Sequence, residues 1–240
     1  MTRPSSLPVL IEFLGLVLPG DSAAMQRVRE EVIEFGLNPL AKTLLIEGPI
    51  GSGKSTLARA ISMIKRIAPL TGEEARKYVK LMRFDELGRV ELKLMPWYVE
   101  LALTGLADNL ADAQLFGTNK GAFTDATDRA GVFEQAQTGR RKSQEREEPG
   151  ARLTNGVVFL DEIGDLSHAH QAKLLPVLSA GVFYRLGTEG GQNRELQYTG
   201  TTITASWRPL QSLLRPDLYS RISANRIRLP GLADRMDDFD

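Results

Sequence analysis

A glycine-rich segment near residue 50 has the residue types and spacing of a phosphate-binding loop. In Gly48-Pro49-Ile50-Gly51-Ser52-Gly53-Lys54-Ser55, small residues let backbone N–H groups close around phosphate oxygens. Lys54 would neutralise the β and γ oxygens of ATP, and Ser55 would ligate Mg²⁺, with Thr56 next to it in the following helix. The alternative is a glycine-rich turn without a ligand. The strand and helix expected on either side argue against that alternative.

A pair of carboxylates follows a second apolar run, Val157 to Leu160. At the end of a buried strand, Asp161 could make a second contact to Mg²⁺, usually through water. Glu162 is placed to orient and deprotonate a water that attacks the γ-phosphate. A strand end with a helix cap produces the same pattern, but the upstream loop favours Mg²⁺-dependent ATP hydrolysis.

Spacing alone does not decide the roles of three further residues. Arg215 and Arg221 flank Asp217-Leu218-Tyr219 and could stabilise transition-state charge on a neighbouring subunit, or form surface salt bridges. Phe123 lies in a loop of small residues, where it could contact a partner or pack onto its own domain.

Two other features have simpler interpretations. His168 and His170 are two residues apart, so they do not share a helix face as metal ligands would, and we expect a solvated helix start. Residues 139–152 carry five basic and three acidic side chains without apolar periodicity, which predicts a solvated loop.

The chemistry-bearing residues lie between apolar runs that alternate with helical patterns. Asp21-Ser22 offers an N-cap for a helix that reaches Gly36, and a second helix should run from Ser55 to Ala68. Strands are expected at residues 43–46, 97–103, 157–160, 201–205 and 226–229. The alternation predicts one α/β domain over residues 1–240, a mostly parallel five-stranded sheet with helices on both faces. Residues 70–95 are helix-permissive and are expected, like 139–152, to be an insertion.

The composition limits the classes of function. The chain has 240 residues, of which 42% are hydrophobic, and its 30 basic and 30 acidic residues cancel. Protein partners are therefore favoured over DNA. The absence of cysteine excludes disulfides and cysteine zinc sites and fits the cytoplasm. The apolar stretch from Val9 to Leu18 is too short and interrupted to span a bilayer, and we expect it to pack on the domain.

Together, these motifs resemble the AAA+ ATPase domain of sigma-54-dependent transcriptional activators, the bacterial enhancer-binding proteins, over roughly residues 17–238. The landmarks occur in the family's order. They are Gly20 to Val28, the P-loop, Leu115-Phe116-Gly117, Lys120 to Thr124, Gly131 to Ala136, Phe159 to Gly164, Gln171 to Leu175 and Leu214 to Arg221.

The resemblance implies a ring, usually a hexamer, with ATP bound between subunits. It implies that Arg215 and Arg221 act as arginine fingers on the neighbouring subunit. It also implies a GAFTGA-type loop that touches sigma-54 in the RNA polymerase holoenzyme. Here that loop is Gly121, Ala122, Phe123, Thr124, Asp125 and Ala126.

Several positions depart from the family pattern. Asp125 replaces the second glycine of the loop and adds charge at the partner contact. Ala102 replaces an asparagine that holds the catalytic glutamate, and Trp207 stands where a polar sensor residue is usual. Ser55 follows the general P-loop rule and, with Gly48-Pro49 and Lys65-Arg66, is similar to the RNA-repair operon regulators.

These departures motivate two alternatives to sigma-54 remodelling. One is an ATPase of the same fold that acts on a different client, and the other is a nucleotide-binding assembly module with little turnover. The sequence ends at Asp240, before the helical lid and the DNA-binding helix-turn-helix of the family, so direct DNA binding by this chain is not expected.

Overall fold

A parallel β-sheet forms the centre of the protein in a computed structural model that describes residues 4–82, 84, 90–91, 95, 97–122, 126–145, 156–187 and 194–238. Its strands are β1 (Thr43–Glu47), β2 (Tyr98–Ala102), β5 (Val157–Asp161), β8 (Thr201–Ser206) and β9 (Arg226–Arg228). They lie in the order β2-β5-β8-β1-β9, and every neighbouring pair is parallel. The predicted fold class is confirmed, with strand boundaries within two residues of those expected.

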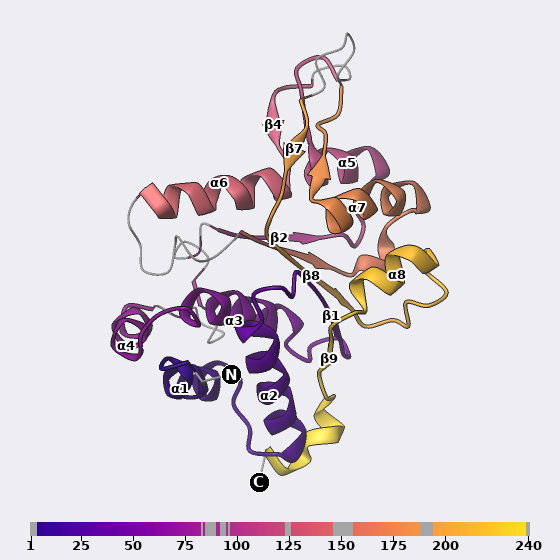
Figure 1. Ribbon diagram of the computed structural model, residues 1–240. Coiled ribbons are helices and arrows are strands. Elements are labelled where there is room, and N and C mark those ends of the chain that lie inside the picture. The colour runs from indigo at the N-terminus through magenta and orange to yellow at the C-terminus, as the bar shows by residue number, and fades with distance from the viewer. Residues whose placement is uncertain are drawn as a thin grey trace.

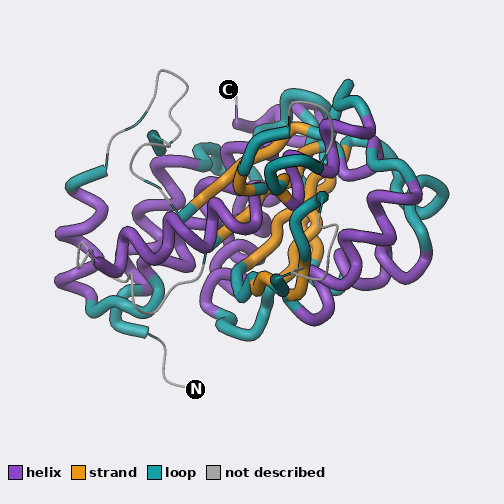
Figure 2. The backbone as a smooth tube through the Cα atoms, turned by 90° about the horizontal axis from the view of Figure 1, so that it is seen from above, coloured by secondary structure: helices purple, strands orange, loops and turns teal. Residues whose placement is uncertain are grey.

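Helices cover both faces of this sheet, as Figures 1 and 2 show. One hydrophobic core lies under α1 (Leu7–Val17), α2 (Ala23–Leu37), α3 (Lys54–Ile67) and α4 (Gly72–Lys80). A second core lies on the opposite face under α5 (Asp108–Phe116), α6 (Val132–Glu145), α7 (His168–Ala180) and α8 (Pro216–Ile222). Burial on both faces explains why β1 and β5 read as continuous apolar runs, whereas the edge strand β9 alternates between exposed arginines and the buried Ile227.

The N-terminal half forms its helices for local reasons that the sequence contains. The Ser22 hydroxyl caps α2 by accepting the Met25 N–H at 3.3 Å, as predicted. The apolar N-terminal stretch forms α1 and packs on the domain, with Leu10 and Phe13 fully buried. Among the described helices, none is long and apolar enough to cross a membrane.

Short elements complete the chain. Two-stranded ribbons are formed by β3 (Gly117–Thr118) with β4 (Arg129–Ala130), and by β6 (Val182–Phe183) with β7 (Leu196–Gln197). A bridge between Thr118 and Leu186 places the two ribbons side by side. The 3-10 segments η2 (Ile163–Asp165) and η3 (Leu232–Asp238) follow β5 and β9.

The loop predicted for residues 139–152 is wrong for its first half. Helix α6 continues to Glu145, and residues 146–155 lie outside the described residues. Phe133 and Ala136 are fully buried and anchor the first turns of α6. Arginine, lysine, glutamine and glutamate have high helix propensity, so they extend an anchored helix without apolar periodicity.

The solvated helix start predicted at the two histidines is also wrong for one of them. His168 is exposed, but His170 is buried, with 4% of its surface accessible. The Nδ1 atom of His170 lies 2.7 Å from the Ser167 hydroxyl, and its Nε2 atom lies 3.4 Å from Asp112 Oδ1 on α5. Packing of α5 against α7 therefore covers a side chain that the helix alone would expose.

Candidate active site

The P-loop connects β1 to α3 at the C-terminal ends of the five parallel strands. The boundary of the sheet formed by these strand ends is called its edge here. Gly51 and Gly53 have φ values of +77° and +97°, which L side chains rarely adopt. At Gly48, a Cβ atom would lie 2.8 Å from Ser52 Oγ and 2.9 Å from Leu229 Cβ. The three glycines thus give the loop its conformation and let it lie against the segment after β9.

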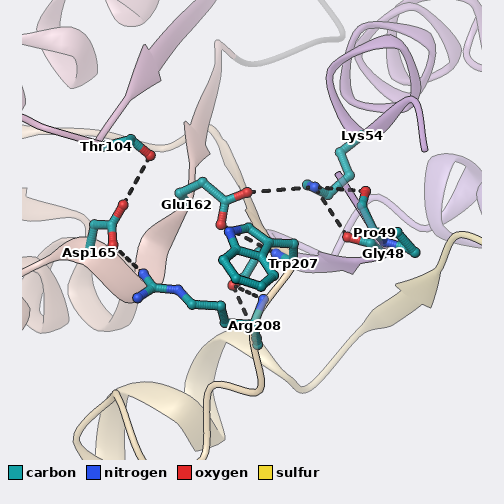
Figure 3. Close-up of polar contacts among 9 residues, drawn as sticks. Gly48, Pro49, Lys54, Thr104, Glu162, Asp165, Trp207 and Arg208 are labelled. Carbon is teal, nitrogen blue, oxygen red and sulfur yellow. Dashed lines mark hydrogen bonds and ion pairs between the residues drawn. The ribbon is translucent and has the colours of Figure 1, made fainter. Parts of the chain in front are cut away.

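Lys54 is the charged group at the centre of this edge. Its side chain is only 8% exposed, and its Nζ donates to the Gly48 and Pro49 carbonyls at 3.2 Å each. The same Nζ lies 3.6 Å from Glu162 Oε1 (Figure 3). The ammonium therefore faces both the loop and the end of β5.

Asp161 and Ser55 lie at the same cavity, whose volume is about 300 Å³. Burial raises the pKa of Asp161 above its ordinary value of 3.8, and the Lys54 charge opposes that shift. The buried Oδ1 atom of Asp161 has no hydrogen-bond partner among the described residues. An orphaned carboxylate oxygen near a hydroxyl fits a hard cation such as Mg²⁺, directly or through water.

Glu162 has the only positive φ among the described non-glycine residues, at +56°. Such strain at a polar cleft is typical of functional positions. Its Oε1 faces Lys54, and its Oε2 accepts the backbone N–H of Trp207 at 3.3 Å (Figure 3). The carboxylate is thus held between β5 and the segment after β8.

Two of the departures from the family pattern, Ala102 and Trp207, lie beside the acidic pair Asp161-Glu162. Ala102 pairs in register with Asp161 on the neighbouring strand and is exposed. Trp207 is 51% exposed, and its contact to Glu162 comes from the main-chain N–H rather than from the side chain. Residue types do not reveal a backbone donor, and the sequence interpretation therefore missed this contact.

Thr104 and Asp165, two further residues at this edge, were also missed. Thr104 Oγ1 donates to Asp165 Oδ2 at 3.0 Å, and the Asp165 Oδ1 atom accepts a hydrogen bond from Arg208 Nη2 (Figure 3). These residues follow β2, β5 and β8, respectively. Their position after strand ends was the one available signal, because parallel strands end at a common edge.

A larger cavity of about 820 Å³ adjoins the first, and Ile50 lines both. It lies between α2, the segment after β8 and the C-terminal segment, with Arg27, Trp207 and Asp234 among its lining residues. The small cavity suits phosphates, and the larger one has room for a nucleoside. The part played by α2 and η3 was not predicted.

Neither candidate arginine lines the phosphate cavity. Thr43 Oγ1 donates to the Arg221 carbonyl at 3.2 Å, which places Arg221 at the start of β1, about 13 Å along the strand from its end. The Arg221 guanidinium donates to the Leu178 carbonyl at 3.0 and 3.1 Å, at the C-terminus of α7. Arg215 pairs with Asp217 at 2.8 Å. The structure therefore does not bring these arginines to the phosphate cavity of their own subunit.

The predicted partner loop is described only at its base. The Gly121 N–H donates to the Ala126 carbonyl at 3.3 Å, and the Ala122 N–H donates to the Asn119 carbonyl at 3.1 Å. Phe123, Thr124 and Asp125 lie outside the described residues. The ribbon of β3 and β4 supports this base and projects from the sheet beside β7 (Figure 1).

Comparison with known families gives one model match, to the "Sigma-54 interaction domain", over residues 89–141 and 143–228. The match begins after the P-loop. Curated relatives cover more of the chain. The transcriptional regulator VasH of Vibrio cholerae is 28% identical over 99% of this chain, and the Nif-specific regulatory protein of Herbaspirillum seropedicae is 31% identical over 91%. The chain spans 37% and 32% of those relatives' lengths.

Solved structures show the same fold. NtrX from Brucella abortus, in a crystal structure with ATP, aligns with a TM-score of 0.63 at 22% identity, covering 92% of this chain and 40% of NtrX. A cryo-electron microscopy structure of Hsp104 with ATPγS and casein aligns with a TM-score of 0.58 at 17% identity, covering 95% of this chain and 37% of Hsp104.

Proposed function

Because this chain belongs to the Sigma-54 interaction domain family, we propose that it binds and hydrolyses ATP within a ring of subunits and uses the resulting motion on sigma-54 holoenzyme. The single observation that carries the proposal is the approach of Lys54 Nζ to Glu162 Oε1, at 3.6 Å beside the P-loop cavity. This arrangement supports the proposal that a cation for phosphates lies next to a base for water.

Each residue of the cavity has a distinct part in the proposed reaction. The P-loop amides and the N-terminus of α3 cradle the phosphates, and Lys54 moves from the Gly48 and Pro49 carbonyls to the β and γ oxygens. Ser55 and Asp161 would hold Mg²⁺, which when bound supplies charge neutralisation. Glu162 orients a water in line with the γ-phosphate and accepts its proton.

The position of the arginines supports catalysis between subunits. Arg221 lies about 13 Å along β1 from the P-loop end, so in this conformation it does not reach the phosphates of its own subunit. We infer that Arg215 and Arg221 act on a nucleotide bound by the neighbouring subunit. A lone subunit should then hydrolyse ATP slowly.

The client contact is proposed for Gly121 to Ala126 on the projecting β3–β4 ribbon. Asp125 adds a negative charge to this loop, which distinguishes it from the GAFTGA pattern. Binding to sigma-54 in the presence of ADP-aluminium fluoride would support this client. Binding that is absent, and stays absent in Asp125→Gly, would favour a different client.

Turnover measured against protein concentration tests the function. We expect the rate per subunit to rise with concentration, and Glu162→Gln to lower it by about 10²- to 10⁴-fold while nucleotide binding persists. Glu73→Gln is the matched control, because Glu73 is an exposed carboxylate of α4. Equal turnover in wild type and Glu162→Gln would contradict hydrolysis at this site and favour an assembly module.

A mixing experiment tests the trans arrangement. Glu162→Gln and Arg221→Ala should each be nearly inactive alone. In mixed rings, an Arg221→Ala subunit supplies an intact base, and its Glu162→Gln neighbour supplies an intact arginine. We therefore expect mixing to restore part of the turnover, whereas no recovery in rings shown to be mixed would contradict catalysis between subunits.

A further inference from the structure

Two turns that follow neighbouring strands are tied together at two points. The first turn holds Glu162 and Asp165, whose backbones are joined by the Asp165 N–H to Glu162 carbonyl bond at 2.9 Å. The second turn holds Trp207 and Arg208. One tie is the Trp207 N–H to Glu162 Oε2 bond at 3.3 Å, and the other is the ion pair between Arg208 and Asp165.

The turn after β8 is itself fixed. The Ser206 hydroxyl, which is buried, accepts the Arg208 N–H at 3.0 Å and donates to the Arg208 carbonyl at 3.1 Å. At Gly164, a Cβ atom would lie 3.0 Å from Leu210 and 3.4 Å from Arg208 Nη2. The two turns are therefore in close contact, and a small shift of one would change the position of the other.

Thr104 extends the tie to a third strand. Its hydroxyl donates to the Asp165 oxygen that does not accept from Arg208, so Asp165 is held from both sides (Figure 3). The Asp165 and Arg208 side chains are 27% and 29% exposed, so the pair is partly shielded from water. A hydrogen-bonded chain thus crosses the ends of β2, β5 and β8.

We propose that Thr104, Asp165 and Arg208 form a positioning bridge that holds the Trp207 N–H against the carboxylate of Glu162. Resting on the hydrolysis proposed above, the bridge sets the direction from which Glu162 meets its water. Ala102, on the strand beside Asp161, has no polar side chain for this task. The main-chain amide of Trp207 supplies the donor to Glu162 instead.

The bridge acts on the step after binding. Thr104 and Asp165 line neither cavity, and their described contacts do not include the P-loop or Lys54, so substitutions at these two positions should leave nucleotide affinity unchanged. Arg208 lines the larger cavity and is therefore left unaltered in the test. The Glu162 carboxylate is contacted by the Trp207 N–H and by Lys54 Nζ. Without the Trp207 contact, the carboxylate spends less time in the orientation that aligns the attacking water with the γ-phosphate. Loss of the bridge therefore lowers kcat and leaves nucleotide affinity unchanged.

A matched set of variants of the full chain tests the bridge. Thr104→Val removes the hydroxyl at nearly constant shape and should lower kcat about fivefold, the equivalent of one hydrogen bond. Thr104→Ser keeps the hydroxyl and should restore the wild-type rate. Asp165→Asn removes the charge that holds Arg208 and should lower kcat about tenfold or more. Thr71→Val is the control, because it breaks a similar hydroxyl–carboxylate bond, at 2.8 Å to Glu74, at the N-cap of α4.

Tryptophan fluorescence gives a readout that a general loss of stability would not reproduce. The chain has two tryptophans; Trp97 is 1% exposed and Trp207 is 51% exposed. Acrylamide quenching at constant folded fraction therefore reports mainly on Trp207. We expect quenching to change in Asp165→Asn and Thr104→Val and to match wild type in Thr104→Ser and Thr71→Val.

The bridge is supported if kcat falls and Trp207 quenching changes while nucleotide affinity and Tm hold. It is overturned if kcat is unchanged, if kcat and affinity fall together with Tm, or if Thr104→Ser is as slow as Thr104→Val. A Glu162→Gln arm separates the two proposals. If Glu162→Gln loses turnover and the bridge variants do not, the bridge alone fails. If Glu162→Gln keeps turnover, hydrolysis at this site fails and the bridge fails with it.

Discussion

The charged groups at the C-terminal ends of the parallel strands make different contacts from those at the N-terminal ends, and these two ends form two edges of the sheet. At the edge where the strands end, Lys54 and Glu162 face a cavity and each other. At the opposite edge, the Arg221 guanidinium donates to the Leu178 and Ser179 carbonyls at the end of α7, a favourable place for a cation. One edge is built to receive a ligand, and the other holds a cation that a ligand on a neighbour could attract. In the proposed mechanism, each subunit binds phosphate by itself and receives one catalytic charge from its neighbour.

The strongest way to break this comparison is to remove the arginine. In Arg221→Ala, we expect turnover to fall by about 10³-fold with nucleotide affinity unchanged, since an arginine finger stabilises only transition-state charge. Steady-state turnover at saturating ATP and a nucleotide titration measure the two effects. Arg76→Ala, at an exposed position of α4, is the control. A parallel loss of affinity would place Arg221 in the ground-state binding site.

The reciprocal change at the other edge is Lys54→Ala. We expect nucleotide affinity to fall about 10- to 100-fold, because charge-assisted hydrogen bonds to phosphate are lost. Equilibrium binding of a fluorescent ATP analogue measures this. Lys54→Ala should also bind the nucleotide less tightly than Arg221→Ala. The reverse order would mean that Arg221, not Lys54, contributes to ground-state nucleotide binding.

A smaller effect separates backbone conformation from side-chain chemistry. In Gly53→Ala, the added Cβ meets no atom within 4 Å, so the φ of +97° is the main cost, about 1–2 kcal/mol of unfolding free energy. Gly15→Ala in α1 is the matched control. There the added Cβ also meets nothing, and helix propensity should stabilise the protein by about 0.5–1 kcal/mol. Chemical denaturation measures the change in unfolding free energy for both variants. Changes of the same sign would contradict backbone strain at position 53.

The smallest expected effect is a pH dependence of the unfolding free energy, which arises from Asp238 at the N-terminus of α2. Burial opposes ionisation of Asp238, but hydrogen bonds from the Ser22 N–H and hydroxyl, at 2.6 and 3.0 Å, lower its pKa below 3.8. A carboxylate with a lowered folded-state pKa stabilises the fold above its unfolded pKa, and this stabilisation is lost as pH falls through the folded pKa.

Thermal unfolding between pH 6 and acid conditions, about pH 3, measures that contribution. Asp238→Asn should unfold at a lower temperature than wild type at pH 6, and the difference should shrink in acid. A difference that is constant across this range would contradict the ionic hydrogen bonds to Ser22.

Much of the fold was open to prediction because it rests on local patterns. The strand runs at 43–46 and 157–160 were predicted because strands buried on both faces are apolar at every position. The length of α6 and the burial of His170 were not. Both depend on which helix packs beside which, and neither α6 nor α7 contains that information in its own residues.

The residue types of Gly48–Ser55, Asp161 and Glu162 by themselves determined the kind of chemistry, because few side chains suit phosphates, Mg²⁺ and water activation at that spacing. Only the tertiary structure decided how Glu162 is held. The Trp207 N–H and the bridge from Thr104 to Arg208 come from turns after different strands, and a parallel sheet brings those turns to one edge. It also decided that Arg221 lies at the other edge, because α8 packs beside the start of β1 rather than its end.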